Sequence, residues 1–229
     1  MVQIRSVGMK LFYIEQKGRS MIEMLGVLAI VGILSVGAIS GYSIAMRKYK
    51  INRLKDEYTQ FIHDVLLYDN EWKKMAKQHP EQELFFINSY VFKMNLFPKL
   101  WILDTKTNWI VDSMGGRFTL FVRQGTGKID IDYQTKGKQK SNADAKDLCI
   151  AMVYDVFRQM SANTYLLTAY TEKYSDDNEN TGTASLKWYG DDYCGGNRKC
   201  LSDLSLSDII THCTSCAHND TCRWIIQFE

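Results

Sequence analysis

The segment "QKGRSMIEMLGVLAIVGILSVGAISGYSIAM", residues 16–46, contains a long apolar run that begins beside a single acid. No charged residue occurs from Met24 to Met46, and a helix of that length, at about 1.5 Å per residue, crosses the roughly 30 Å hydrocarbon core of a membrane. One acid, Glu23, stands at the start of the apolar run. A carboxylate at the centre of a bilayer costs about 2.5–3.5 kcal/mol even on the insertion scale, so this acid requires a specific reason.

The charges before the apolar run are mostly positive. The cations there are Arg5, Lys10, Lys17 and Arg19, and the only acid before Glu23 is Glu15. A cationic leader before an apolar span predicts that the amino terminus stays in the cytoplasm and that the chain after Arg47 is exported. The cysteine count agrees with export, because an even number of cysteines, here six, is expected of disulfides in an oxidising compartment.

The composition of the whole chain limits its function. With 229 residues and a net charge of +2, it is one anchored domain without the basic patch that nucleic-acid binding requires. The sequence has no Ser-His-Asp order, P-loop or glycine-rich nucleotide turn. We therefore expect a protein that is not an enzyme and that holds no cofactor.

Two common explanations of the apolar run are a single-pass signal anchor and a secretory signal peptide that is cleaved after Ala38 in "SVGA". The run is longer than the apolar part of a secretory signal. Neither explanation gives a reason for Glu23 to stand five residues after Gly18.

The stretch "KGRSMIE", residues 17–23, and the apolar residues after it resemble the prepilin signal of type IV pilins and type II secretion pseudopilins. In that family a glycine is followed by five residues ending in glutamate and then by an apolar helix. The resemblance implies that prepilin peptidase removes residues 1–18, that Arg19 becomes an N-methylated first residue, and that Glu23 acts in filament assembly. Arg19 departs from the family, in which the residue after the cleaved glycine is usually Phe.

One long helix is predicted from about Met21 to His79, because no proline occurs before Pro80. Residues 19–46 form its transmembrane or filament-core half, and residues 47–79 form an amphipathic half. The apolar stripe of the second half has residues three or four apart: Ile51, Leu54, Tyr58, Phe61, Val65, Tyr68, Trp72 and Met75. We expect this stripe to pack under a globular head of residues 80–229.

The head is predicted to be α+β. In "GGRFTLFVRQGTGKIDIDYQ", residues 115–134, apolar residues alternate on both sides of a Gly-Thr-Gly turn, which indicates a β-hairpin. Its inward residues are Phe118, Leu120, Val122, Ile129, Ile131 and Tyr133, and the residues expected to face water are Lys128, Asp130 and Asp132. Residues 141–160 are predicted to form a helix whose buried side consists of Leu148, Met152, Val153, Val156 and Met160.

This order, a Gly-Gly before a hairpin and then a helix with one cysteine, resembles the heads of type IVb pilins, including the thin-pilus pilins of conjugative plasmids. The implied fold is pilin-like: a long amino-terminal helix packs on an antiparallel β-sheet, and disulfides close residues 194–222. In that family the helix cysteine is tied to one near the carboxyl terminus, so the resemblance implies that Cys149 bonds to Cys213, Cys216 or Cys222. We favour a local Cys194–Cys200 loop, with Cys149 bonded to Cys222 or Cys213.

Other roles for the cysteines and acids are weaker. "CTSC", residues 213–216, lacks the βαβ context of a redox motif, and a zinc site of Cys194, Cys200, Cys213 and Cys216 is less favoured than disulfides in an exported domain. His212 and His218 are expected to be solvated. The acids of two further loops lack EF-hand spacing for calcium: Asp176, Asp177, Glu179, Asp191 and Asp192. Three aromatic residues could form an adhesive surface, but we expect them in the core: Trp188, Tyr189 and Tyr193.

The functional expectation is a structural subunit of a type IVb pilus for adhesion, motility or conjugation. It is made as a single-pass inner-membrane precursor with a periplasmic head, and it assembles into an extracellular filament of like or mixed subunits. Its implied partners are prepilin peptidase, the membrane and the inner-membrane assembly platform. The alternatives are a pseudopilin of a secretion or DNA-uptake system and an uncleaved, signal-anchored periplasmic binding protein.

Overall fold

The computed structural model of the chain describes residues 21–135, 142–172, 183–215 and 221–229. The chain divides into two compact units, residues 1–47 and 48–229. Several sequence predictions lie outside the described residues: those on the leader, Arg19, Asp176, Asp177, Glu179, Cys216 and His218.

The predicted single helix is two helices. Helix α1 (Met21–Leu66) contains the apolar run and most of the amphipathic stripe, and α2 (Asp69–Lys77) follows after a two-residue turn. At the break, Trp72 Nε1 donates a hydrogen bond of 2.9 Å to the Val65 carbonyl, and the Tyr68 N–H bonds to the same oxygen at 3.2 Å. The prediction of one helix to His79 is therefore wrong, because the turn returns Trp72 to the core, where it is 2% exposed.

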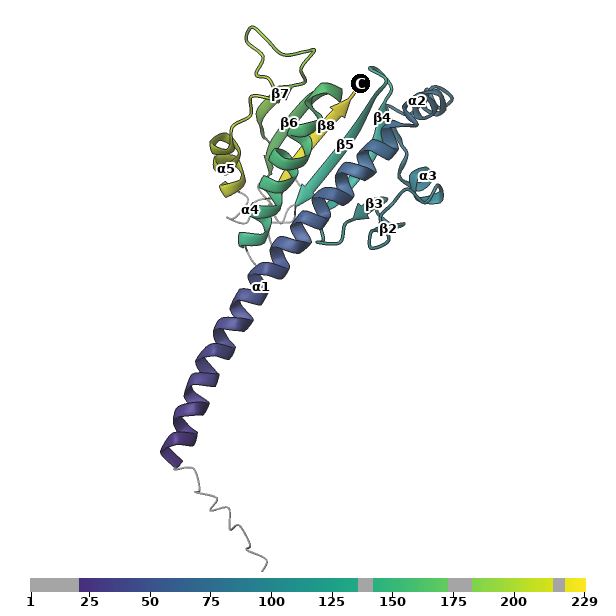
Figure 1. The fold of residues 1–229 in the computed structure, drawn as a ribbon. Coiled ribbons are helices and arrows are strands. Elements are labelled where there is room, and N and C mark those ends of the chain that lie inside the picture. Colours follow the sequence, from purple (N-terminus) through teal and green to yellow (C-terminus); the bar gives the residue numbers. More distant parts are fainter. Residues whose placement is uncertain (1–20, 136–141, 173–182, 216–220) are drawn as a thin grey trace, which may run out of the picture. The chain divides into compact units, whose positions relative to one another are not determined.

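Eight strands form one antiparallel sheet within the described residues, in the order β2-β3-β4-β5-β8-β6-β7, and β1 lies on the same edge of β4 as β3 (Figure 1). The strands are β1 (Leu84–Phe86), β2 (Ile102–Asp104), β3 (Trp109–Val111), β4 (Arg117–Arg123), β5 (Lys128–Thr135), β6 (Thr164–Glu172), β7 (Thr183–Tyr189) and β8 (Thr221–Phe228). The last strand in the sequence, β8, lies in the middle of the sheet, between β5 and β6. The carboxyl-terminal residues are thus part of the core of the head.

The predicted hairpin is formed by β4 and β5. Leu120 pairs with Ile131 and Val122 with Ile129, which places the apolar residues of both strands on one face. All six side chains predicted to point inward are buried, each at 1% exposed or less. The alternating pattern thus predicted the hairpin and its buried face.

The predicted helix of residues 141–160 is partly regular. Helix α4 (Asn142–Ile150) continues into a π-helical turn, η1 (Ala151–Val156), and then a 3₁₀ segment, η2 (Phe157–Asn163). The predicted inward residues are buried or, for Met160, partly buried. Three consecutive residues, Ala151, Met152 and Val153, are buried, which is a wider buried face than the roughly 100° apolar stripe of a typical surface helix.

In the unit of residues 48–229, the helices cover one face of the sheet. The part of α1 from residue 48 and helix α4 lie across that face (Figure 1), and their apolar side chains share one core with β4, β5 and β8. Two short helices complete the unit, α3 (Asn88–Lys93) and α5 (Leu206–Ser215). The predicted class, mixed helix and antiparallel sheet with a long apolar amino-terminal helix, is confirmed.

Candidate functional site

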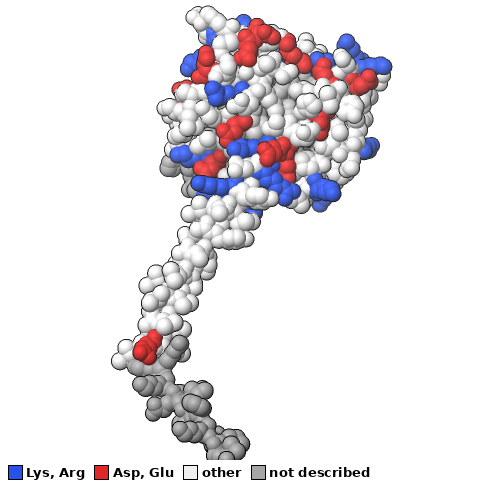
Figure 2. All heavy atoms as spheres, in the orientation of Figure 1, with Lys and Arg blue, Asp and Glu red and all other residues white. Residues whose placement is uncertain are grey.

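The apolar part of α1 carries large side chains on its outside. Leu25, Ile33 and Val36 are 66%, 75% and 71% exposed. Figure 2 shows an almost uncharged surface along this segment. By length and composition this helix could cross a membrane. Exposed apolar surface on this scale marks a site of contact with lipid or with other protein.

Glu23 lies in the first turn of α1 and is exposed. A negative charge there is stabilised by the helix dipole, by about 0.3–1 kcal/mol. Further along the same segment, at Gly26, Gly32, Gly37 and Gly41, an added Cβ atom would meet nothing within 4 Å. Contacts within the chain therefore do not require these glycines, whereas the close approach of a second helix would.

Two acids predicted to face water, Asp130 and Asp132, are instead buried on the sheet face away from α1, at 0% and 3% exposed. Arg123 Nη2 donates a hydrogen bond of 2.7 Å to Asp130 Oδ2, and Gln227 Nε2 donates one of 2.9 Å to the same oxygen. Burial raises the pKa of Asp130, and the hydrogen bonds from Gln227 and Arg123 oppose that rise. The prediction is wrong because β8 lies beside β5 and brings polar side chains over these carboxylates.

Asp132 is held by a bidentate ion pair. Arg223 donates from Nε to Oδ1 at 2.8 Å and from Nη2 to Oδ2 at 2.5 Å. The arginine side chain is 28% exposed and the aspartate side chain 4% exposed. A fork-to-fork pair of this kind fixes the plane of the guanidinium group as well as its position.

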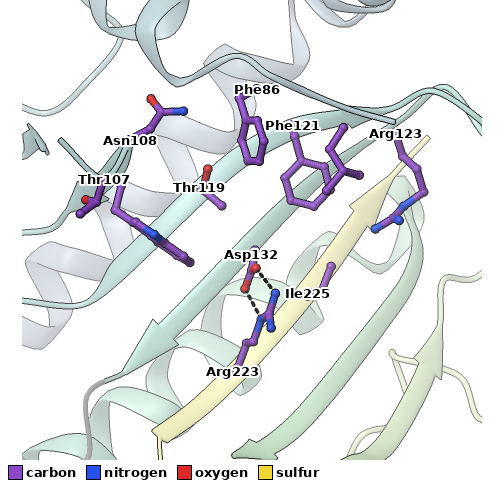
Figure 3. Close-up of a pocket in the computed structure, with 11 residues that line it drawn as sticks. Phe86, Thr107, Asn108, Thr119, Phe121, Arg123, Asp132, Arg223 and Ile225 are labelled. Atoms are coloured by element: carbon purple, nitrogen blue, oxygen red, sulfur yellow. Dashed lines mark hydrogen bonds and ion pairs between the residues drawn. The ribbon is translucent and has the colours of Figure 1, made fainter. Parts of the chain in front are cut away.

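A pocket of about 390 Å³ opens on this outer sheet face, next to the Asp132–Arg223 pair (Figure 3). The rings of Phe86 and Phe121 lie edge to face, with centroids 5.6 Å apart, and form part of the wall. The lining residues are Leu84, Phe86, Thr107, Asn108, Trp109, Thr119, Phe121, Arg123, Asp132, Arg223 and Ile225. They come from five strands and the β2–β3 loop, so no local sequence pattern could have indicated this pocket.

A further carboxyl, Asp112, is buried between the helix and the sheet. Its Oδ1 accepts hydrogen bonds from the N–H groups of Met114 and Gly116, at 2.8 and 2.9 Å. Its Oδ2 accepts hydrogen bonds from Tyr58 Oη at 3.0 Å and Tyr133 Oη at 3.4 Å. Burial raises the pKa of Asp112, while these hydrogen bonds lower it. Burial, followed by the charge of Asp112, raises the pKa of both tyrosines well above 10, so they remain protonated donors.

The cysteines that the structure describes form disulfides. Cys194 bonds to Cys200, and Cys149 in α4 bonds to Cys213 in α5, which is one of the two partners that the sequence left open. Cys222 is also disulfide-bonded. Since Cys213 is joined to Cys149, it does not form a redox pair within "CTSC". No group of three or more His, Cys, Asp or Glu residues in the described part of the chain is arranged to hold a metal ion.

Histidine and aromatic residues near the carboxyl terminus are placed as follows. His212 is 6% exposed, and its ring lies 6.3 Å from that of Trp224, so the prediction of a solvated histidine is wrong. Burial lowers the pKa of His212. Trp188 is in the core as expected, whereas Tyr189 and Tyr193 are half-buried.

The remaining acidic loop that the sequence singled out contains Asp191 and Asp192, and both are exposed. Asp191 Oδ2 accepts a hydrogen bond of 2.9 Å from Ser161 Oγ. This contact anchors the loop to η2.

Comparison with known proteins gives no relative: no protein-family model, curated protein or solved structure matches this chain. The candidate sites are therefore the apolar segment of α1 with Glu23 and the pocket on the outer sheet face.

Proposed function

We propose that this chain is a filament subunit of the type IV pilin kind, most similar to b-type pilins. It is made as a membrane-anchored precursor, cleaved after Gly18 and polymerised through α1. The observation that carries the proposal is the exposed apolar segment of α1, in which Glu23 in the first turn is the single acid before the uncharged run of residues 24–46. That acid stands five residues after Gly18, which is the spacing of a prepilin signal.

The exposed apolar surface supports assembly through α1. Moving apolar surface out of water is worth about 25 cal/mol per Å². Side chains such as Leu25 and Ile33 that leave lipid for a helix bundle gain only the van der Waals packing between helices. The glycines at positions without near neighbours allow other helices to approach closely. In the precursor the same segment is the membrane anchor, so one surface serves both states.

Glu23 then has a specific role. Once the peptide bond after Gly18 is cut, Arg19 carries a new amino group, and that cation on a neighbouring subunit neutralises the Glu23 carboxylate in the filament core. A buried charge is tolerated when it is paired with an opposite charge. A subunit that is out of register leaves its Glu23 carboxylate buried without a partner, so that arrangement is disfavoured. The acid thus favours the subunit arrangement in which each carboxylate meets an amino group.

The disulfides support export of the head. Structural disulfides persist in oxidising compartments, and both Cys149–Cys213 and Cys194–Cys200 are in the unit that follows the apolar segment. This agrees with the charge asymmetry of the leader, which predicts a cytoplasmic amino terminus.

Replacing Glu23 tests the proposal. Glu23→Ala removes the carboxylate without adding bulk, so we expect normal membrane insertion and loss of the subunit from sheared, sedimented filaments. Glu71→Ala is a matched control, because Glu71 is also an exposed acid in the first turn of a helix, α2. If Glu23→Ala cells produce filaments in normal amounts and these filaments contain the variant subunit, Glu23 does not have the role proposed for it.

The pocket on the outer sheet face favours a second candidate, an uncleaved signal-anchored binding protein of the periplasm. In that case α1 is only an anchor, and Glu23→Ala has no effect on the amount or location of the protein. The two candidates therefore differ in the chemistry of the amino terminus, which is intact in the second.

A further inference from the structure

We propose that the pocket on the outer sheet face binds the pyranose ring of a neutral carbohydrate. The inference does not depend on filament assembly, because the pocket lies wholly within residues 48–229 and is complete in one chain. It assigns a binding function to the face of the sheet that the helices leave uncovered.

The apolar walls suit the flat, C–H-rich face of a sugar ring. The pocket volume of about 390 Å³ lies at the small end of the 300–1,000 Å³ range of ligand pockets. Phe86 is 42% exposed although its ring contacts Phe121, so the fold leaves an aromatic surface open at the pocket. An aromatic ring that packs against the apolar C–H face of a sugar leaves the hydroxyl groups at the edge of the sugar free to hydrogen-bond.

One polar group in the wall lacks a complete set of partners. Thr119 is 6% exposed, and its hydroxyl oxygen accepts a hydrogen bond of 2.8 Å from Asn88 Nδ2. Asn88 Nδ2 also donates to the Asn108 carbonyl, so the amide is held firmly in place. Within the described residues the Thr119 hydroxyl has no acceptor for its own proton. A buried donor without an acceptor is costly, so a ligand oxygen at this position would be favoured.

The ion pairs decide the charge of the ligand. Arg123 is paired with Asp130. Arg223 is paired with Asp132 (Figure 3), so each arginine at the pocket is compensated by a carboxylate. A charged ligand entering this pocket would lose hydration without gaining an uncompensated opposite charge. A wholly apolar ligand would leave the Thr119 hydroxyl without an acceptor. A neutral ligand with one apolar face and a polar edge satisfies both conditions, and a pyranose ring has this form.

Binding is measured by saturation-transfer NMR on the full chain in micelles of a detergent without a sugar headgroup. The probes are methyl β-galactopyranoside, methyl α-mannopyranoside, methyl N-acetyl-β-glucosaminide and, as the anionic counterpart, methyl β-glucuronide. We expect at least one neutral glycoside to receive saturation at its ring C–H protons, with a dissociation constant on the order of 1 mM, and the glucuronide to bind more weakly.

Two variants locate the site. We expect Phe86→Ala and Thr119→Val each to lower the affinity for the neutral glycoside by about five- to tenfold, as the loss of one good contact does. Thr119→Val keeps the shape of the side chain and removes only the hydroxyl. Phe92→Ala is the matched control, because Phe92 is 49% exposed on α3 and does not line the pocket. Equal melting temperatures of the variants and the wild type show that the head is folded.

Three results would overturn the proposal: no neutral glycoside binds, the glucuronide binds more tightly than every neutral glycoside, or Phe86→Ala and Thr119→Val bind as well as Phe92→Ala. Binding of a hydrophobic dye at the pocket without binding of any glycoside would also overturn it, because the pocket would then be only an apolar groove.

Discussion

Tyr58 Oη donates a hydrogen bond of 3.0 Å to Asp112 Oδ2 and so joins the buried face of α1 to the turn between β3 and β4. Tyr133 of β5 bonds to the same oxygen, and the N–H groups of the turn bond to the other. One carboxyl group therefore connects a helix, a turn and a strand at the centre of the head. This arrangement makes Asp112 a sensitive point for the stability of the unit of residues 48–229.

Asp112→Ala is expected to destabilise the head by roughly 2–4 kcal/mol, because it leaves two N–H groups, one of them buried, and two buried hydroxyls without their acceptor. Asp112→Asn retains an oxygen for the N–H groups and is expected to cost less. The measurement is urea unfolding of the full chain in detergent micelles, followed by tryptophan fluorescence. Equal stability of Asp112→Ala and wild type would contradict the arrangement.

The raised pKa of Asp112 also makes a pH prediction. Since the folded pKa lies above the unfolded value of about 3.9, the native state binds more protons than the unfolded state between these two values. The contribution of this group is therefore largest below the unfolded pKa, and the free energy of unfolding falls as pH rises through the window. We expect Asp112→Asn to show a smaller fall than wild type in the same window. Parallel curves for the two proteins would show that Asp112 does not titrate in this way.

Gly116 is required by the same cluster. A Cβ atom at this position would overlap Asp112 Oδ2 and Tyr133 Oη, and neither group can move without losing its hydrogen bond. Gly116→Ala is expected to lower the free energy of unfolding by about 1–3 kcal/mol, the usual cost of overpacking a core. Gly125→Ala is the control, because a Cβ there meets nothing within 4 Å. If the two substitutions have the same effect on unfolding, the close packing around Gly116 is not present.

The two described disulfides are expected to differ in their effect. The cysteines of the Cys149–Cys213 bond are 64 residues apart in sequence, and those of Cys194–Cys200 are 6 apart. The loop-entropy relation gives about 4 kcal/mol for the first and about 2 kcal/mol for the second. Paired Cys-to-Ala variants, compared by urea unfolding after peptide mapping of the bonds, test this order. A larger loss for Cys194–Cys200 would contradict it, as would peptides that join Cys149 to Cys222.

Local patterns explain what the sequence predicted about the fold. The apolar run and the β4–β5 hairpin follow from patterns in consecutive residues, and both were predicted. Strand β8 has an equally regular alternation, with Cys222, Trp224, Ile226 and Phe228 all buried, but it was not predicted as a strand. Its place between β5 and β6 is set by pairs such as Ile131 with Ile226, and no local pattern records which distant strands will pair.

The candidate sites differ in the same way. Glu23 is identified by its distance from Gly18, which is a property of six consecutive residues. The pocket depends on Phe86, Thr119 and Arg223, which the fold brings together from three strands. The burial of Asp130 and Asp132 was missed for the same reason, since their partners on β8 are distant in sequence.

The proposed function depends on how the amino terminus is processed. Mass spectrometry of the amino-terminal peptide, from protein isolated from membranes and from sheared filaments, measures this directly. We expect a chain that starts at Arg19 and bears a methyl group on its amino nitrogen. A chain that retains Met1, or one that starts at Ile39 after cleavage as a secretory signal, would contradict the proposal that this protein is a filament subunit of the type IV pilin kind.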